Sequence, residues 1–128
     1  MKDLTIIVTI LVAVFIGNNY TQNLLKNDSG ELAGQLEILK EDINANEKDF
    51  EEQKDRANKI YENWVKKSEN WSVLIDHQEI DLIEKAILGV KSGIETNETS
   101  KAIQKIEESI FLVNHIPEKE KLNVKNIF

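Results

Sequence analysis

The 128-residue chain contains no cysteine, one proline and five glycines. The absence of cysteine excludes disulfide bonds, thiolate zinc sites, a cysteine nucleophile and a lipid attached to an N-terminal cysteine. Few prolines and glycines, combined with 30% charged residues, argue against a sheet rich in turns. The composition therefore predicts an all-α protein.

Positive charge is also in deficit, with 16 Lys and Arg against 23 Asp and Glu and a net charge of −7. An acidic chain repels phosphate backbones, so we expect no nucleic-acid partner. The sequence has no nucleophile elbow, phosphate-binding loop, H-E-x-x-H motif or EF-hand pattern. We therefore expect no enzyme activity and no cofactor.

An apolar run without charges stands close to the N-terminus. Leu4 to Ile16 form 13 residues that are apolar except for two threonines. As a helix this run is about 20 Å long, and the next six residues, with Tyr20 at the interface, would complete a membrane span of about 30 Å. A cleaved signal peptide is the alternative, because its apolar core has a similar length. No small-x-small cleavage site follows the run, which favours an uncleaved signal-anchor over residues 1–25.

The charges that flank this run predict its orientation. The amino group and Lys2 stand against Asp3 on one side, and Lys26 stands against Asp28 and Glu31 on the other. This slight bias predicts a cytoplasmic N-terminus. The expected location is the cell membrane, with a single pass and an extracytoplasmic domain over residues 29–128.

Two helices are predicted within residues 30–75. The second is expected to start near Asn46, as N-cap, with Asp49 three residues later. Its apolar residues repeat every seven positions and include both tryptophans, which favours core packing over an aromatic platform for a ligand. The two apolar faces consist of Leu32, Leu36, Leu39 and Ile43, and then of Phe50, Ala57, Ile60, Trp64, Trp71 and Leu74.

Two more helices are predicted within residues 76–116. Asp76 as N-cap with Glu79 three residues later forms a capping box, Asn97 is expected to cap the last helix, and Pro117 to end it. The tail over residues 118–128 is expected to dock on the domain because it contains four apolar residues. The two helix faces consist of Ile80, Ile83, Ile87, Val90 and Ile94, and then of Ile103, Ile106, Ile110 and Val113.

The two helix pairs show a weak internal repeat at an offset of 51 residues. Leu32, Leu36, Leu39 and Ile43 correspond to Ile83, Ile87, Val90 and Ile94. A chance alignment of two amphipathic patterns is the alternative to a true repeat. Both interpretations predict an N-terminal membrane helix followed by a small antiparallel helical bundle of two αα-hairpins.

Both histidines of the chain are expected to meet at one corner of this bundle. If the last two helices pair about Thr96 and Asn97, His115 lies opposite Gln78 and near His77. Histidines with carboxylates can bind a divalent metal or transfer protons. Helix capping and pairing with the helix dipole explain the same residues without a ligand and are favoured. The predicted cluster consists of Trp71, Asp76, His77, Glu79, Asp81 and His115, and its metal-binding subset of His77, His115 and Asp76.

The chain also resembles domain-of-unknown-function family 4363. The resemblance covers nearly the whole chain and is carried by Trp64, Ile75-Asp76-His77, Glu79-Ile80-Asp81, Ile83-Glu84, His115-Ile116, Glu120, Leu122 and Asn126-Ile127-Phe128. The resemblance implies a small helical protein of Gram-positive spore-forming bacteria with one membrane anchor and no assigned activity.

Two functions from different classes are compatible with these patterns. The first is a membrane-anchored, non-enzymatic interaction or structural module that engages an envelope or membrane-protein partner. The alternative is a sensor that binds a divalent metal or small ligand at the His77 and His115 acidic cluster.

Overall fold

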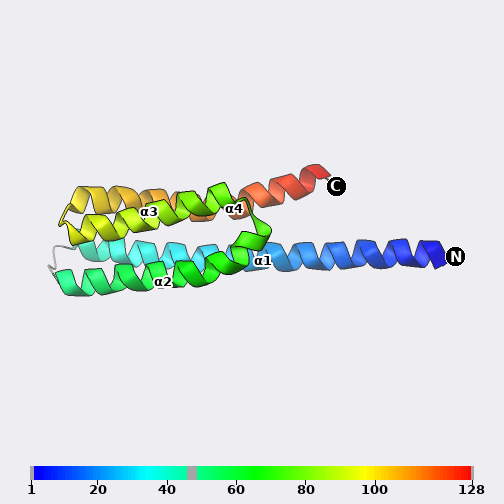
Figure 1. The fold of residues 1–128 in the computed structure, drawn as a ribbon, viewed down its shortest axis with the longest axis horizontal. Helices are drawn as coiled ribbons and strands as arrows, with labels where there is room; N and C mark the ends of the chain where they lie inside the picture. Colours follow the sequence, from blue (N-terminus) through cyan, green and yellow to red (C-terminus); the bar gives the residue numbers. More distant parts are fainter. Residues whose placement is uncertain (1, 46–48, 128) are drawn as a thin grey trace.

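The computed structural model describes residues 2–45 and 49–127, with side chains as far as residue 119. Four helices occupy these ranges, and no strand is found in them. They are α1 (Lys2–Asn44), α2 (Phe50–Leu74), α3 (His77–Glu95) and α4 (Thr99–Ile127) (Figure 1). The predicted all-α fold is confirmed.

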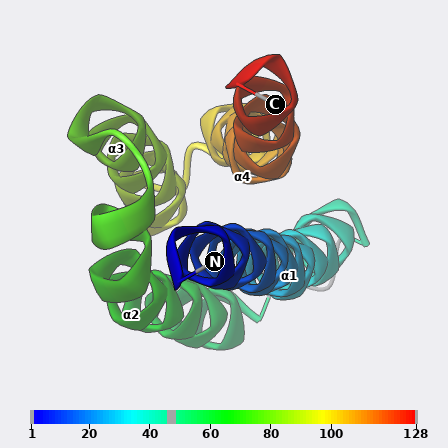
Figure 2. The ribbon, with the colours of Figure 1, turned by 90° about the vertical axis from the view of Figure 1, so that its right-hand side faces the viewer.

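The four helices form an antiparallel bundle of two hairpins. α1 packs against α2 and α4, and α3 packs against the same two helices. Seen end-on, the helices surround a common centre (Figure 2). The predicted pair of stacked αα-hairpins is therefore present.

The core draws apolar side chains from all four helices. Three repeated positions of the first half and four of the second are buried, so both halves of the sequence repeat face the core. Trp64 and Trp71 are fully buried, which confirms that the tryptophans pack in the core. The buried repeat positions are Leu32, Leu36, Leu39, Ile83, Ile87, Val90 and Ile94.

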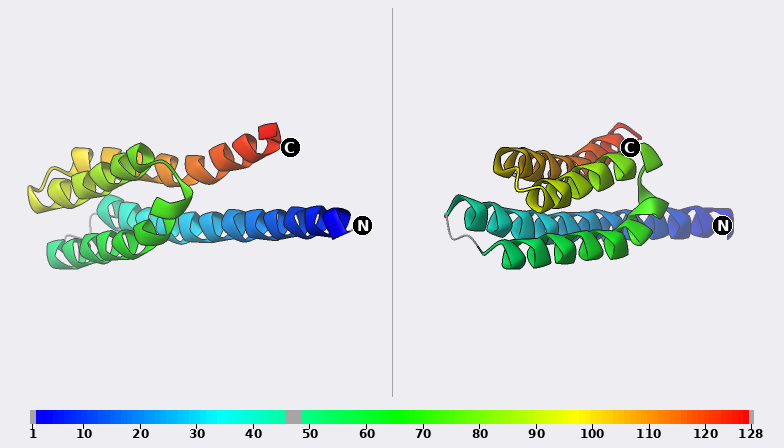
Figure 3. Two further views of the ribbon diagram at one scale, coloured as in Figure 1. Left: turned by 45° about the vertical axis from the view of Figure 1, so that its right-hand side comes forward. Right: turned by 60° about the vertical axis from the view of Figure 1, so that its left-hand side comes forward.

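α1 divides into two parts that have opposite surroundings. The large apolar side chains from Leu4 to Ile16 are 44–67% exposed, whereas Leu25 and the apolar residues that follow on the same face are buried. The helix is continuous for 43 residues, and its first part extends beyond the bundle (Figures 1 and 3). This exposed part belongs to a helix long and apolar enough to cross a membrane.

Pro117 does not end the last helix, contrary to the prediction. α4 continues through it to Ile127. Proline removes one backbone donor, but Val113 and Ile116 pack the preceding turns into the core, and their burial keeps the helix in place. Past this position α4 diverges from α1 (Figures 1 and 3). The predicted docking of Leu122, Val124, Ile127 and Phe128 concerns side chains outside the described residues.

Two helix ends differ from the prediction. The N-cap of α2 is Asp49, whose carboxylate accepts a hydrogen bond from the Glu52 N–H at 3.2 Å, while the expected cap Asn46 lies outside the described residues. Asn97 adopts a positive φ of 57° and terminates α3, so it does not cap α4. The Asn97 N–H binds the Ile94 carbonyl and the next N–H binds the Gly93 carbonyl, as in a Schellman motif.

Candidate functional site

The predicted capping box at the start of α3 is half formed. Asp76 is the N-cap, and its carboxylate accepts a hydrogen bond from the Gln78 N–H at 3.1 Å. The Glu79 carboxylate, however, pairs with Lys119 of α4 instead of returning to the cap. Glu79 therefore links the two helices of the second hairpin.

The observed register separates the predicted acid and histidine residues. The contacts of Gly93 with Ala102 and of Glu79 with Lys119 shift the pairing of α3 and α4 by two to five positions from the expected one. The turn is also one residue longer than expected, because Asn97 ends α3 in a left-handed conformation instead of capping α4. Lys119, not His115, faces the start of α3.

His115 instead stacks on Phe111, one turn earlier in α4, with ring centroids 5.5 Å apart and an angle of 9° between the planes. His77, Asp81 and His115 are all exposed. Among the described side chains, no three histidines or carboxylates are placed to hold a metal ion. The predicted metal set of Asp76, His77 and His115 is therefore not assembled there.

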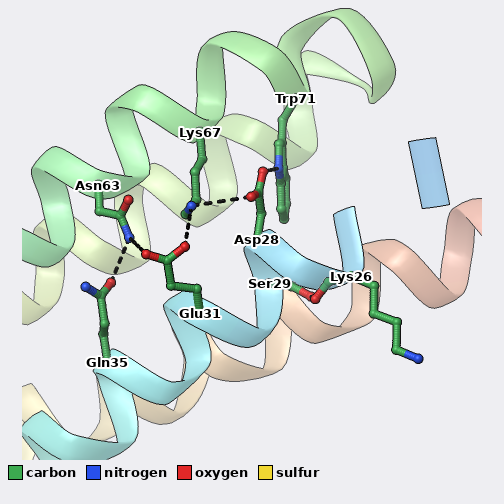
Figure 4. Close-up of polar contacts among 8 residues, drawn as sticks. All are labelled: Lys26, Asp28, Ser29, Glu31, Gln35, Asn63, Lys67 and Trp71. Carbon is green, nitrogen blue, oxygen red and sulfur yellow. Dashed lines mark hydrogen bonds and ion pairs between the residues drawn. The ribbon is translucent and has the colours of Figure 1, made fainter. Parts of the chain in front are cut away.

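Trp71 belongs to a different group of residues, the α1–α2 polar network (Figure 4). Its indole Nε1 donates a hydrogen bond to Asp28 Oδ2 at 2.9 Å. Lys67 Nζ lies 3.3 Å from the other oxygen of Asp28 and 2.7 Å from Glu31 Oε2. Lys67 and Asp28 side chains are each only 14% exposed, so this pairing is largely removed from solvent.

A side-chain amide pair extends the network toward the loop between α1 and α2. Asn63 Nδ2 donates to Gln35 Oε1 at 2.9 Å and lies 3.4 Å from Glu31 Oε1. The complete network consists of Asp28, Glu31 and Gln35 on α1 and of Asn63, Lys67 and Trp71 on α2. It fixes the rotation and the register of α2 on α1.

The charges of this network reinforce one another. The hydrogen bond from Lys67 lowers the pKa of the Glu31 carboxyl, and a smaller effect of burial opposes it. Burial acts to lower the pKa of Lys67, but the hydrogen bond to Glu31 and the charge of Asp28 outweigh it, so this pKa is raised. Both groups are therefore held in their charged forms, which suits a structural clamp.

Sequence analysis missed this network, although a signal for it exists. Its α1 members are spaced by three and four residues, and its α2 members by four and four, so each set lies on one helix face. The network also depends on how α1 and α2 are rotated against each other. The residue spacing within one helix does not contain that rotation. A pairing of Lys67 with the carboxylates of Asp28 and Glu31 would have predicted it.

The two tryptophans differ in how their indole N–H groups are used. Their rings meet edge to face, with centroids 5.5 Å apart and an angle of 85° between the planes. Trp71 donates to Asp28, whereas Trp64 Nε1 is buried without a hydrogen-bond partner among the described residues. Trp64 therefore contributes through packing and Trp71 through packing and a charge-assisted hydrogen bond.

A polar cleft, here called the α1–α4 cleft, opens where α4 diverges from α1. Side-chain amides of α1 and α4 make up half of its ten lining residues, with Lys26 and Glu118 as its charged residues. Lys26 points away from the α1–α2 polar network (Figure 4). The cleft lies directly after the exposed apolar part of α1.

The bundle also exposes several large apolar side chains. Val73 at the end of α2 is 84% exposed and Phe111 on α4 is 64% exposed. Leu82 and Leu88 on α3 are 51% and 42% exposed. The surface of the bundle thus offers apolar contacts besides its charged residues.

Comparison with known proteins identifies the family. The sequence profile of a domain of unknown function, DUF4363, matches residues 19–127. The chain belongs to the DUF4363 family. No curated protein and no solved structure matches it significantly. The DUF4363 match begins after the exposed apolar run and includes all of the bundle.

Proposed function

We propose that this DUF4363 protein is a membrane-anchored, non-enzymatic interaction module that presents its helical surfaces to a membrane or envelope protein. The observation that supports it most directly is the division of α1 into an exposed apolar part and a part buried in the bundle. A fully buried large apolar side chain stabilises by about 1.5–3 kcal/mol relative to an exposed one. A bilayer around residues 4–16 supplies that burial for many such side chains at once.

The proposed topology follows the flanking charges. The N-terminus lies in the cytoplasm, a single helix crosses the membrane, and the bundle lies outside. An uncleaved segment is part of the proposal, and it is supported by the continuity of α1 from this segment into the core.

Membrane anchoring is tested by fractionation of cells that express the full chain. We expect the protein to stay in the membrane pellet after carbonate washing, with the mass of the uncleaved chain. The double variant Val8→Lys/Val12→Lys should leave the pellet, because each central lysine costs about 2.5–3.5 kcal/mol. Lys59→Glu, on the exposed face of α2, is the matched control and should stay. A wild-type chain that is soluble, or shortened at its N-terminus, would contradict the proposal.

The partner is tested at the most prominent aromatic surface of α4. Phe111 is 64% exposed and is stacked by His115, so a rigid apolar ring projects from the bundle. A photo-crosslinking residue at position 111 should capture a membrane or envelope protein in cells, whereas the same residue at Lys101 should not. Recovery of the uncrosslinked chain alone from both positions would count against an interaction at this surface.

A further inference from the structure

The α1–α4 cleft is unusual in a chain with so many charged residues. Five of its side chains are neutral amides, namely Asn18, Asn19, Gln22, Asn23 and Asn114. No charged residue occurs between Leu4 and Leu25. The chain thus lines this opening with groups that both donate and accept hydrogen bonds but carry no charge.

The depth of the cleft follows from the proposed membrane anchor, on which this inference rests. The middle of the apolar run is Ile10, so the half-thickness of a hydrocarbon core, about 15 Å or about ten helical residues, ends near Tyr20. The headgroup layer adds about 5–7 Å, or about four to five further residues, so it contains Gln22 and Asn23 and ends beside Lys26.

The register of α4 agrees with this placement. The ion pair of Lys40 with Glu107, 3.2 Å long, sets α4 antiparallel to α1. Eleven residues further along, Glu118 lies about level with Ser29, and both line the cleft. The α4 side of the cleft therefore also lies at the headgroup boundary.

We infer that the α1–α4 cleft binds the headgroup of a zwitterionic phospholipid, with phosphatidylethanolamine as the specific ligand. The amide N–H groups and the Lys26 ammonium bind the phosphate, which only accepts hydrogen bonds. The Glu118 carboxylate and the amide oxygens bind the headgroup ammonium. Opposite charges at two places in one amide-lined cleft match the phosphate and the ammonium of such a headgroup.

A polar helix of a membrane partner is the other class of occupant, because amides also bind across membrane helices. The cleft favours the lipid for two reasons. Its two charges have opposite signs, and the bilayer supplies the headgroup at this depth without any partner.

The inference is tested by native mass spectrometry of the full chain in detergent, titrated with phosphatidylethanolamine, phosphatidylglycerol or diacylglycerol. We expect retention of both phospholipids over diacylglycerol, which has no phosphate, and of phosphatidylethanolamine most strongly. Lys26→Gln should weaken both phospholipid adducts about three- to tenfold, as the loss of a partly solvated charged hydrogen bond does. Glu118→Gln should weaken only the phosphatidylethanolamine adduct, and the exposed Lys59→Gln should change neither.

Equal retention by the cleft variants and the control, or equal binding of diacylglycerol, would overturn the inference. Unchanged lipid adducts together with loss of a crosslinked membrane protein from Lys26→Gln would replace the lipid with a partner helix. Flotation of the wild-type chain with vesicles that contain phosphatidylethanolamine or phosphatidylglycerol tests the anchor and the cleft separately. A chain that floats without headgroup preference refutes the cleft alone, and one that does not float refutes the anchor and the cleft together.

Discussion

The two hairpins occupy equivalent places in the bundle, but different contacts hold each of them together. The first hairpin joins α1 to α2 through a largely buried polar network and two indole rings. The second brings the backbones of α3 and α4 together at Gly93, where an added Cβ would lie 2.9 Å from Ala102 Cα and N.

This difference shows two ways of fixing how one helix lies on another. Charged and hydrogen-bonding side chains specify a partner at a distance and tolerate small changes in backbone spacing. A glycine contact specifies spacing directly and leaves no room for a side chain. Unfolding of full-chain variants in detergent micelles separates the two.

Loss of an indole in the first hairpin should have the largest effect. Trp64→Ala and Trp71→Ala should each lower the free energy of unfolding by about 3–5 kcal/mol, because both rings are fully buried. Denaturant unfolding followed by circular dichroism measures the change. Near-native stability of either variant would show that its ring is not part of the core.

Phenylalanine at the same positions separates packing from hydrogen bonding. Trp71→Phe should cost about 1–3 kcal/mol more than Trp64→Phe, because it leaves Asp28 without its indole donor. Equal losses would show that the Trp71 hydrogen bond adds nothing to the first hairpin.

Filling the glycine contact should be the next largest effect. Gly93→Ala should destabilise by about 1–3 kcal/mol, because its Cβ meets backbone atoms of Ala102 that cannot move aside alone. Gly89→Ala is the matched control, since its Cβ meets only the flexible Lys105 side chain and it gains helix propensity. If the unfolding midpoint of Gly93→Ala were equal to or higher than that of Gly89→Ala, the close contact between Gly93 and Ala102 would be contradicted.

The turn of the second hairpin should respond less. Asn97→Ala should cost about 1 kcal/mol, because alanine is disfavoured at a φ of 57°. Asn97→Gly should retain or raise stability, since glycine adopts this conformation freely. Thermal melts of the two variants measure the difference, and an Asn97→Gly variant no more stable than Asn97→Ala would contradict the left-handed turn.

Acid should weaken the first hairpin slightly. The folded state lowers the pKa of Glu31 from its ordinary value of 4.5, so this contribution is full above that pH and is lost as the pH falls through the folded pKa. The effect should stay below about 1 kcal/mol because the Glu31 side chain is 55% exposed. Stability measured from pH 7 to pH 3 should fall less in Glu31→Gln than in the wild type, and parallel curves would exclude the pairing.

Much of the fold follows from periodicity in the sequence. The spacings of Leu32, Leu36 and Leu39, and of Ala57, Trp64 and Trp71, predicted helix faces that are buried. Burial of an apolar face dominates helix packing, so the spacing of apolar residues along the sequence predicts which face of each helix is buried.

The helix ends and the register of the second hairpin are not determined by the spacing of apolar residues. Asparagine suits both an N-cap and a left-handed helix end, so Asn97 alone could not distinguish the end of α3 from the start of α4. Pro117 breaks an isolated helix but not one whose earlier turns are packed. The candidate site also depends on the register of α3 and α4, which pairs Lys119 with Glu79, while His115 stacks on Phe111 of its own helix.

The continuity of α1 has a further consequence for how the bundle is aimed. Each residue of an α-helix advances about 1.5 Å and turns about 100°. With no break between the exposed apolar part and the core residues from Leu25 onward, helical phase fixes how the bundle is rotated relative to that exposed part. In the proposed membrane topology, the side of the exposed part that faces a neighbour within the bilayer therefore determines which side of the bundle faces that neighbour outside it.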